Sequence, residues 1–184
     1  MSKPSVSPET IRTLLDYDPD TGVMVWRKRE PELFSSEKAQ KTWNSRFAGK
    51  EIGSRHTHGY LKACINYEQH FVHRLAFAHY YGRWPENEID HINGIRTDNR
   101  IENLRDVTRT ENLQNQKLSS LRSRPDGLLG VHWNKDQNKW VAHIKVGKKS
   151  RHLGVFDGKQ AAQAAYRSAK LALHPGYVAE GAGP

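Results

Sequence analysis

The sequence predicts an α+β fold built in two parts. Alternating apolar residues indicate short strands in the middle and in the C-terminal third, and each group is followed by apolar residues at helical spacing. A stretch rich in Ser, Arg, Pro and Gly separates the two patterns and indicates a linker. A chain of 184 residues has room for two small domains. We therefore expect an N-terminal helix-and-strand accessory region at 1–58, a central module at 59–118, a linker at 119–126, a C-terminal module at 127–176 and a tail at 177–184.

The accessory region begins with a predicted helix over residues 9–17, after the helix-start signal Ser7-Pro8. The run Asp18-Pro19-Asp20-Thr21-Gly22 predicts a turn into a strand at residues 23–29. The polar stretch 30–50 has no clear period, so it predicts a loop that contains one helix at most. We expect the helix, turn and strand to be structural, and the role of 30–50 is open.

The central module combines a hairpin, a helix and a second, capped helix. Residues 59–66 and 69–72 read as strands joined by the short connection Tyr67-Glu68. Apolar residues then recur at helical spacing from Val72 to a stop at Gly82. Further on, Thr108 to Glu111 has the Thr-x-x-Glu form of a capping box, which predicts a helix start there. His73 fits a packed core histidine and an active-site supporting residue equally well.

The C-terminal module predicts a three-stranded antiparallel sheet packed on one helix. The strands are expected at 129–134, 139–146 and 150–156, and Asp157 is expected to cap a helix that ends near Leu173. In the middle strand, residues from Trp140 to Val146 alternate between two faces, so one face can pack on the helix and the other can meet a ligand. The predicted core of the module uses small helix residues with two large partners: Ala161, Ala162, Ala165, Ala169, Ala172, Trp140 and Leu153.

Charge and composition narrow the class of partner. The formal net charge is +9, and residues 122–174 carry 11 Lys and Arg against three Asp. Such a balance favours a polyanion, although a solvated basic surface would look the same. The chain has no run of about 18 apolar residues and no secretory signal at its start, so we expect a cytoplasmic protein without a membrane partner. Cys64 is the lone cysteine and there is no CxxC pair, which argues against a structural zinc.

The segment 89–112, IDHINGIRTDNRIENLRDVTRTEN, holds the candidate catalytic residues. Asp90 and Asn112 offer the oxygen ligands that a hard divalent cation prefers, and they would form a metal site. His91, neutral near pH 7, can act as a general base on water. Asn103 can accept the proton on the far ring nitrogen of His91 and so fix its orientation. Metal-assisted hydrolysis of a phosphodiester needs this combination of groups.

Residues 73–116, from the His-Arg-Leu lead-in through Asp-His-Ile-Asn-Gly to the Glu-Asn of the helix, resemble the HNH endonucleases, in particular the homing endonucleases of bacteriophages. The resemblance implies a ββα-metal fold around one divalent ion. It also implies that Asp90 and Asn112 are metal ligands, His91 the general base and Asn103 its orienting residue. Because Asn112 stands where many members carry histidine, we expect Mg²⁺, with Mn²⁺ as the alternative.

Residues 127–174 are similar to the plant apetala-type (ethylene-response-factor) DNA-binding domain, on the pattern GVHWN, KWVAHIKV and RHLGVF followed by an Ala-rich helix. This second resemblance implies a sheet that enters the major groove of double-stranded DNA. Trp133 and Trp140 are interpreted as packing residues. The DNA-facing positions implied for this chain are His132, Asn134, Lys139, His143, Lys145 and His152.

The leading hypothesis is a site-directed, metal-dependent DNA endonuclease of the homing type, which nicks because a single centre cuts one strand per encounter. We expect a monomer, with a dimer as the alternative, working in a bacterial cytoplasm if it is phage-encoded. A sequence-specific DNA-binding regulator with an inactive HNH remnant is the main alternative, and an RNA-binding protein is a third. The recognition site, the physiological metal and the choice between a nick and a double-strand cut are open.

Overall fold

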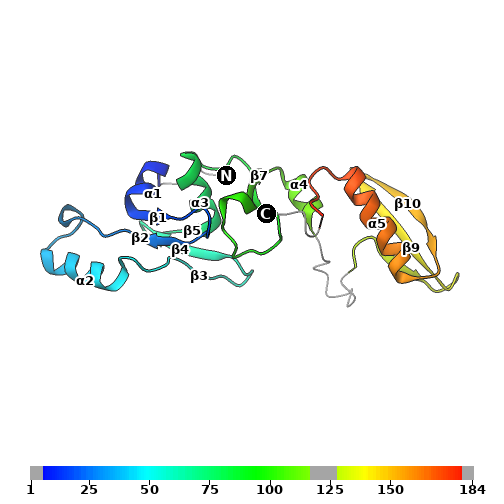
Figure 1. Cartoon of the computed structure of the whole chain (residues 1–184), viewed down its shortest axis with the longest axis horizontal. Coiled ribbons are helices and arrows are strands. Elements are labelled where there is room, and N and C mark those ends of the chain that lie inside the picture. The colour runs from blue at the N-terminus through cyan, green and yellow to red at the C-terminus, as the bar shows by residue number, and fades with distance from the viewer. Residues whose placement is uncertain (1–5, 117–127, 180–184) are drawn as a thin grey trace. The chain divides into compact units, whose positions relative to one another are not determined.

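A computed structural model describes residues 6–116 and 128–179 of the chain, and it divides the chain into two compact units. Unit 1 runs to Asp106 and unit 2 begins at Val107. Within the described residues the fold is mixed, with five α-helices and four small sheets (Figure 1). None of these helices is long and apolar enough to cross a bilayer. The expected linker at 119–126 lies outside the described residues, so the expected domain boundaries stay predictions.

Unit 1 begins with a short helix and a two-stranded sheet. Ser7 caps helix α1 (Pro8–Leu14), and strand β1 (Leu15–Tyr17) pairs with β2 (Met24–Trp26). The predicted helix over 9–17 is therefore too long: its last three residues are extended because they form the ladder with β2. The predicted turn is confirmed, since the Gly22 N–H donates to the carbonyl of Asp18 at 2.9 Å.

The polar stretch 30–50 contains a 3-10 turn (Pro31–Leu33) and helix α2 (Glu37–Phe47), which Ser36 caps. The next sheet has the order β3 (Ser54–Arg55), β4 (Leu61–Ile65) and β5 (Glu68–Phe71). Its hairpin turn is Asn66-Tyr67 rather than the predicted Tyr67-Glu68, because Ile65 pairs with Glu68. Both turn residues have positive φ, 49° and 65°, which matches the twist of a two-residue hairpin.

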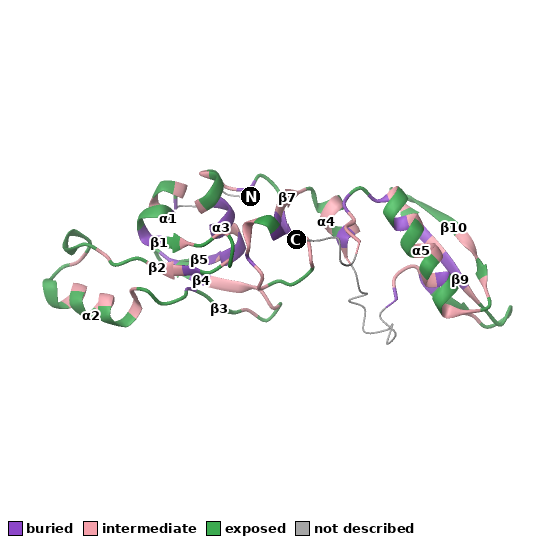
Figure 2. Ribbon diagram, viewed as in Figure 1, coloured by how far each residue is buried: buried purple, intermediate pink, exposed green. Residues whose placement is uncertain are grey.

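Helix α3 (Val72–Tyr81) forms the centre of the unit 1 core and ends at Gly82 in the left-handed conformation, as predicted. Its buried side chains pack with those of α1, β1, β2 and β4, and Figure 2 colours much of the α3 ribbon as buried. The chain continues through β6 (Glu88–His91), a 3-10 turn (Ile101–Asn103) and β7 (Leu104–Val107), and β6 pairs with β7. Strand β6 therefore carries Asp90 and His91, both buried, at its last two positions.

Unit 2 contains helix α4 (Arg109–Asn115) and the C-terminal module. Thr108 and Glu111 form the predicted capping box at the start of α4. Strands β8 (Val131–Asn134), β9 (Lys139–Val146) and β10 (Lys149–Phe156) form an antiparallel sheet in the order β10-β9-β8, and helix α5 (Lys159–Leu173) packs against it (Figure 1). The N-cap of α5 is Gly158, not the predicted Asp157, whose carboxylate instead pairs with Lys139 at 3.1 Å.

The core of the C-terminal module is smaller than predicted on the helix side. Ala162 is buried, whereas Ala161 and Ala172 are exposed. The helical stripe that faces the sheet is completed by Tyr166, which packs against the core together with Trp140, Leu153 and Phe156. A large ring therefore fills space that the sequence pattern assigned to alanines.

Candidate functional site

Asp90 is buried on β6 and is held by an arginine from the neighbouring strand. Its Oδ2 accepts hydrogen bonds from Nε and Nη2 of Arg105, at 2.9 and 2.6 Å. The aspartate side chain is 8% exposed and that of Arg105 is 24% exposed. Pairing with the guanidinium offsets the cost of burying the carboxylate and fixes its orientation.

The neighbouring His91 is buried as well, and its ring contacts Asn99. The distance from His91 Nε2 to Asn99 Oδ1 is 3.3 Å. Burial lowers the pKa of His91 below its usual value, while the Asn99 contact and the carboxylates of Asp90 and Asp98 act in the opposite direction. The ring is therefore neutral near pH 7. When Nε2 donates to the Asn99 oxygen, the lone pair that can accept a proton lies on Nδ1.

Two aromatic rings from other parts of unit 1 pack around His91. The His73 ring of α3 meets it edge-on with a centroid distance of 5.1 Å, and the Tyr60 ring lies 5.8 Å away. His73 is also stacked on Phe71 at 5.3 Å, and its Nδ1 has no hydrogen-bond partner. Burial lowers the pKa of His73 to about 3, so this second histidine is neutral too. The packing restricts the directions in which the His91 ring can turn.

Asn103 is fully buried and organises the loop that follows β6. Its Oδ1 accepts from the Asn93 N–H at 2.9 Å, and its Nδ2 donates to the Asp98 carbonyl at 2.8 Å. In this structure the Asn103 oxygen accepts from Asn93 and the His91 ring contacts Asn99, so the orienting role of Asn103 on His91 stays a prediction. Through its bond to the Asp98 carbonyl, Asn103 anchors the peptide that precedes Asn99, the residue that contacts the His91 ring.

The Asp98 side chain adds a second set of bonds to this loop. Its carboxylate pairs with Arg100 at 2.8 Å and accepts from the Asn93 amide at 2.7 Å. These hydrogen bonds hold the pKa of Asp98 below its usual value, and the bond with Arg100 contributes most. The loop between β6 and β7 is thus fixed at several points around Asn99.

The N-terminal region also supports Asn99, which the sequence did not indicate. The Tyr17 hydroxyl donates to the Asn99 carbonyl at 2.7 Å, and the Ile101 N–H donates to the Pro19 carbonyl at 3.0 Å. Gly22 lies so close that an added Cβ would stand 2.5 Å from the Arg100 nitrogen. Asn99 and Arg105 are the two site residues that sequence reasoning missed, although both lie in the polar run between Asp90 and Asn112.

Asn112, the second predicted metal ligand, lies on α4 and therefore in unit 2. Within this unit, α4 is held by the C-terminal residues: the Val178 N–H donates to Asn115 Oδ1 at 3.1 Å, and Lys170 Nζ donates to the Gln116 carbonyl. Residues 174–178 thus pack against the helix that carries Asn112. The role of Asn112 as a ligand stays a prediction.

The donor chemistry at Asp90 fits a hard divalent ion. Mg²⁺ commonly uses one or two carboxylates and completes its shell with water and phosphate oxygens. Asp90 supplies one such carboxylate, which Arg105 holds in place. Among the described residues there is no group of three or more His, Cys, Asp and Glu side chains that is arranged to hold a metal.

The register of the C-terminal sheet places the six predicted DNA-facing residues on the face opposite α5. Asn134 pairs with Lys139 and His143 pairs with His152 across the strands, while the core residue Ala142 pairs with Val131 on the other face. We call the face opposite α5 the open face; besides these four it carries His132 and Lys145. His132, Lys139, Lys145 and His152 are exposed, and Asn134 and His143 are half-buried.

Two of these residues have other partners in this structure. Asn134 Oδ1 accepts from the backbone of the β8–β9 turn, at 3.0 Å from the Asp136 nitrogen. Lys139 pairs with the exposed Asp157. The His132 and His143 rings lie 5.1 Å apart, and His152 on β10 pairs with His143. Three histidines therefore lie next to one another across the strands. Trp133 and Trp140 contact edge-to-face at 5.3 Å; Trp140 packs against the core as predicted, whereas Trp133 is 40% exposed.

Comparison with protein families identifies the segment that carries the buried site. Residues 70–114 match the family described as HNH endonuclease, a stretch that runs from β5 into α4. The match supports an HNH nuclease, and at the family level it implies nuclease activity, DNA as the substrate and a divalent metal ion. The accessory region and the C-terminal module lie outside the matched residues. The searches of curated proteins and of solved structures returned no match.

Proposed function

We propose that this protein is a metal-dependent DNA endonuclease of the homing type, which nicks one strand per encounter. The main support is the His91–Asn99 contact: a buried, neutral imidazole is held at Nε2 next to a carboxylate, within the segment that matches HNH endonucleases. A neutral imidazole with one nitrogen fixed by a hydrogen bond has the chemistry of a general base.

In the proposed mechanism His91 accepts a proton from the attacking water at Nδ1. Asn99 keeps the ring in the required tautomer, and Asn103 holds the loop that carries Asn99. Buried rings such as His73 limit the motion of the imidazole and keep its pKa low. These groups are set before substrate arrives, so little reorganisation is needed during the reaction.

Asp90 and Asn112 would hold the divalent ion, with Mg²⁺ favoured over Mn²⁺. Such an ion supplies charge neutralisation at the scissile phosphate and at the leaving oxygen. Arg105 pairs with the Asp90 carboxylate and holds its orientation before the ion binds. It is a positioning residue in this proposal.

The C-terminal module would bind double-stranded DNA through the open face. Lys139 and Lys145 would contact phosphates, while His132, Asn134, His143 and His152 would lie toward base edges or sugars. The support is their common face, opposite the helix, together with the excess of basic residues in this third of the chain. One nuclease centre in a monomer would then cut a single strand.

The test is cleavage of supercoiled plasmid and of host and phage genomic DNA in Mg²⁺, with mapping of the ends. We expect nicked circles from the unmodified protein and none in EDTA. His91→Ala should reduce the rate at least 10²-fold and leave DNA affinity, measured without metal, nearly unchanged. His58→Ala, at an exposed histidine of the same unit, is the matched control. Cleavage by His91→Ala at the unmodified rate would refute the base assignment.

A further inference from the structure

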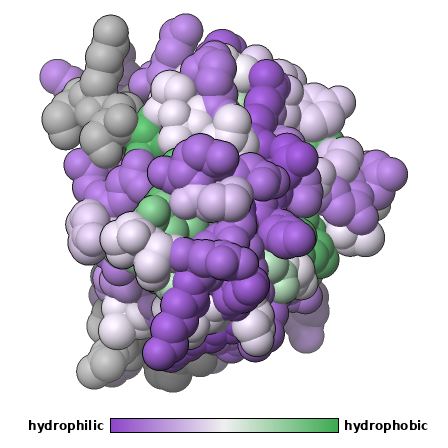
Figure 3. Space-filling view, turned by 90° about the vertical axis from the view of Figure 1, so that its left-hand side faces the viewer, coloured by the Kyte–Doolittle hydropathy of each residue, from purple (hydrophilic) through white to green (hydrophobic). Residues whose placement is uncertain are grey.

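Unit 1 contains a pocket of about 610 Å³ that is separate from the His91 site. It lies between α2 and the sheet of β3, β4 and β5, and none of its lining residues belongs to the segment 90–103. Figure 3 looks onto the end of unit 1 that carries α2, where hydrophilic side chains surround small hydrophobic patches. The volume is in the usual range for small-ligand sites.

The wall on the α2 side is a stack of aromatic rings and one guanidinium. Arg29 lies over the Trp43 ring at 4.0 Å and over the Trp26 ring at 5.1 Å. Trp43 in turn contacts Trp26 edge-on at 5.6 Å and Phe47 at 5.2 Å. We call the Arg29–Trp43 pair the platform. The two indoles stand nearly perpendicular, at 82°, so the flat part of this wall is the Arg29 guanidinium over the Trp43 ring.

The backbone of Arg29 is hydrogen-bonded to side chains of α2. The Arg29 guanidinium has no acidic partner in the described part of the chain. Asn44 accepts from the Arg29 N–H at 2.9 Å, and Asn44 and Gln40 both donate to its carbonyl at 3.0 Å. Its Nε is buried without a hydrogen-bond partner, and burial lowers the pKa of the guanidinium. A buried donor on a charged group that lacks an acceptor is unusual, and a nearby anion would offset the burial of this charge.

The rest of the lining has the polar groups that a nucleotide uses. Lys62 provides a second cation, and Ser54, Asn66 and Gln69 provide hydroxyl and amide groups, whereas the lining contains no Asp or Glu. Aromatic rings and arginine planes stack on nucleobases, and Lys and Arg bind phosphates. A purely apolar ligand would leave the two cations unpaired, so the charge favours an anionic, flat ligand.

We propose that this pocket binds one unpaired nucleotide, with its base stacked on the platform and its phosphate bound by Lys62 and Arg29. That the nucleotide belongs to a single-stranded stretch of DNA rests on the proposed endonuclease function. The preference for a nucleotide rests on the residues that line the pocket. The pocket thus adds a second DNA contact, between α2 and the sheet of β3, β4 and β5, to the one proposed for the open face.

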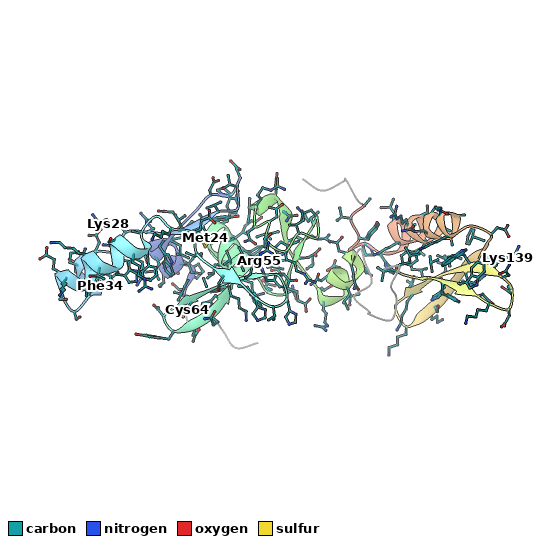
Figure 4. All side chains as sticks on the ribbon, turned by 90° about the horizontal axis from the view of Figure 1, so that it is seen from below. Met24, Lys28, Phe34, Arg55, Cys64 and Lys139 are labelled. Carbon is teal, nitrogen blue, oxygen red and sulfur yellow. The ribbon has the colours of Figure 1, made fainter. Side chains whose placement is uncertain are left out.

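The lone cysteine of the chain allows a direct test. Cys64 is exposed and lines the pocket, and Figure 4 shows it on the sheet, with Lys28 and Phe34 at α2. The measurement is the rate at which a chromogenic thiol reagent modifies Cys64 in the full-length protein in EDTA. Because no metal is present and no bond is cut, the result does not depend on nuclease activity.

We expect a thymidylate 12-mer to slow the modification of Cys64 at least threefold, and a blunt duplex of the same length to leave it unchanged. Arg29→Gln should abolish the protection, and Arg29→Lys should weaken it because lysine keeps the charge but loses the planar surface. Lys28→Gln removes an equal charge from an exposed neighbour outside the pocket and should keep full protection.

Three results would overturn the proposal. Unchanged Cys64 reactivity at 12-mer concentrations that saturate total binding would exclude the pocket as a nucleotide site. Equal protection by the duplex would exclude an unpaired nucleotide, and protection by thymidine monophosphate without protection by the 12-mer would exclude DNA as the source. Thermal unfolding of Arg29→Gln and quenching of tryptophan fluorescence by the 12-mer separate loss of the pocket from loss of the fold.

Discussion

The segment 90–103 of unit 1 and the open face of unit 2 present polar groups in opposite ways. In the first, the four key residues are almost completely buried: Asp90, His91, Asn99 and Asn103 are 7%, 4%, 2% and 0% exposed. On the open face the charged residues are exposed, and Lys139 forms its ion pair with an exposed partner. A buried, bonded network fixes geometry, whereas exposed charges contribute attraction that salt screens. Changes in the first should alter rate and stability, and changes in the second should alter affinity.

The largest effect is expected at Asn99, the residue that bonds the His91 ring. Asn99→Ala removes the acceptor at Nε2, so the imidazole loses its fixed tautomer, and the single-turnover cleavage rate should fall about 100-fold. DNA affinity should change little. Asn87→Ala, at an exposed asparagine of the same unit, is the matched control. If Asn99→Ala lowered DNA affinity as much as it lowers the cleavage rate, Asn99 would act in DNA binding instead.

The next effect is on stability and tests whether the N-terminal region holds the loop. Gly22 has φ of +75°, and a Cβ there would meet the Asn99 and Arg100 backbone within 2.6 Å. Gly49 has nearly the same φ, +76°, but nothing lies within 4 Å of the added carbon. Gly49→Ala should cost about 1 kcal/mol of unfolding free energy from backbone strain alone. Gly22→Ala should cost about 2 kcal/mol more, since the overlap must be relieved by moving the backbone.

Urea unfolding of both glycine variants, with the cleavage rate measured in parallel, checks this expectation. Equal destabilisation at the two positions would show that the contact between the turn and the loop contributes nothing. A Gly22→Ala protein that keeps the full cleavage rate would show that Asn99 does not depend on the N-terminal turn.

The third effect is on the pH dependence of stability and concerns His73. Its pKa is lowered from 6.5 to about 3 by burial, so between these values the unfolded chain binds a proton that the folded chain excludes. The stability is therefore complete above pH 6.5 and falls as the pH decreases toward 3. Between pH 7 and pH 5 this histidine should account for about 2 kcal/mol.

His73→Phe should remove that part of the pH dependence, because a ring of similar size stays among Tyr60 and Phe71. The measurement is the difference in unfolding free energy between the variant and the unmodified protein from pH 7 to pH 5. Other histidines with lowered pKa, such as His70, are common to both proteins and largely cancel in that difference. A difference that does not change with pH would mean that His73 is not buried in its neutral form.

Local sequence signals explain which parts of the fold were predicted. The stop of α3 at Gly82 and the capping box at Thr108 depend on residues within one or two turns of each other, and both were found. The end of α1 was misplaced because the pairing of Leu15 with Trp26 overrides helical spacing. Pairing across a turn is a tertiary preference that no local pattern carries.

The candidate site shows the same limit. The sequence places Asp90 and His91 together because they are neighbours in the chain, and their roles in phosphodiester hydrolysis stay predictions. The partner of the His91 ring could not be predicted, since Asn99 and Asn103 are equivalent amides in one loop and only the folded backbone distinguishes them. Arg105 was missed for a similar reason: its pairing with Asp90 depends on how β7 lies beside β6.

The smallest effect is expected on the open face, and it tests whether attraction to DNA is a property of that face alone. The double variant Lys139→Gln/Lys145→Gln removes two charges proposed to bind phosphates. The slope of log affinity against log salt concentration should flatten by about 0.9 for each phosphate that is no longer neutralised, or about 1.8 in total. Arg167→Gln changes an exposed charge on α5, the element behind the sheet, and should leave the slope unchanged. Because both lysines lie away from the module's core, unfolding free energy should stay within about 0.5 kcal/mol. An equal flattening of the slope in both variants would mean that DNA attraction is spread over the module and is not a property of one face.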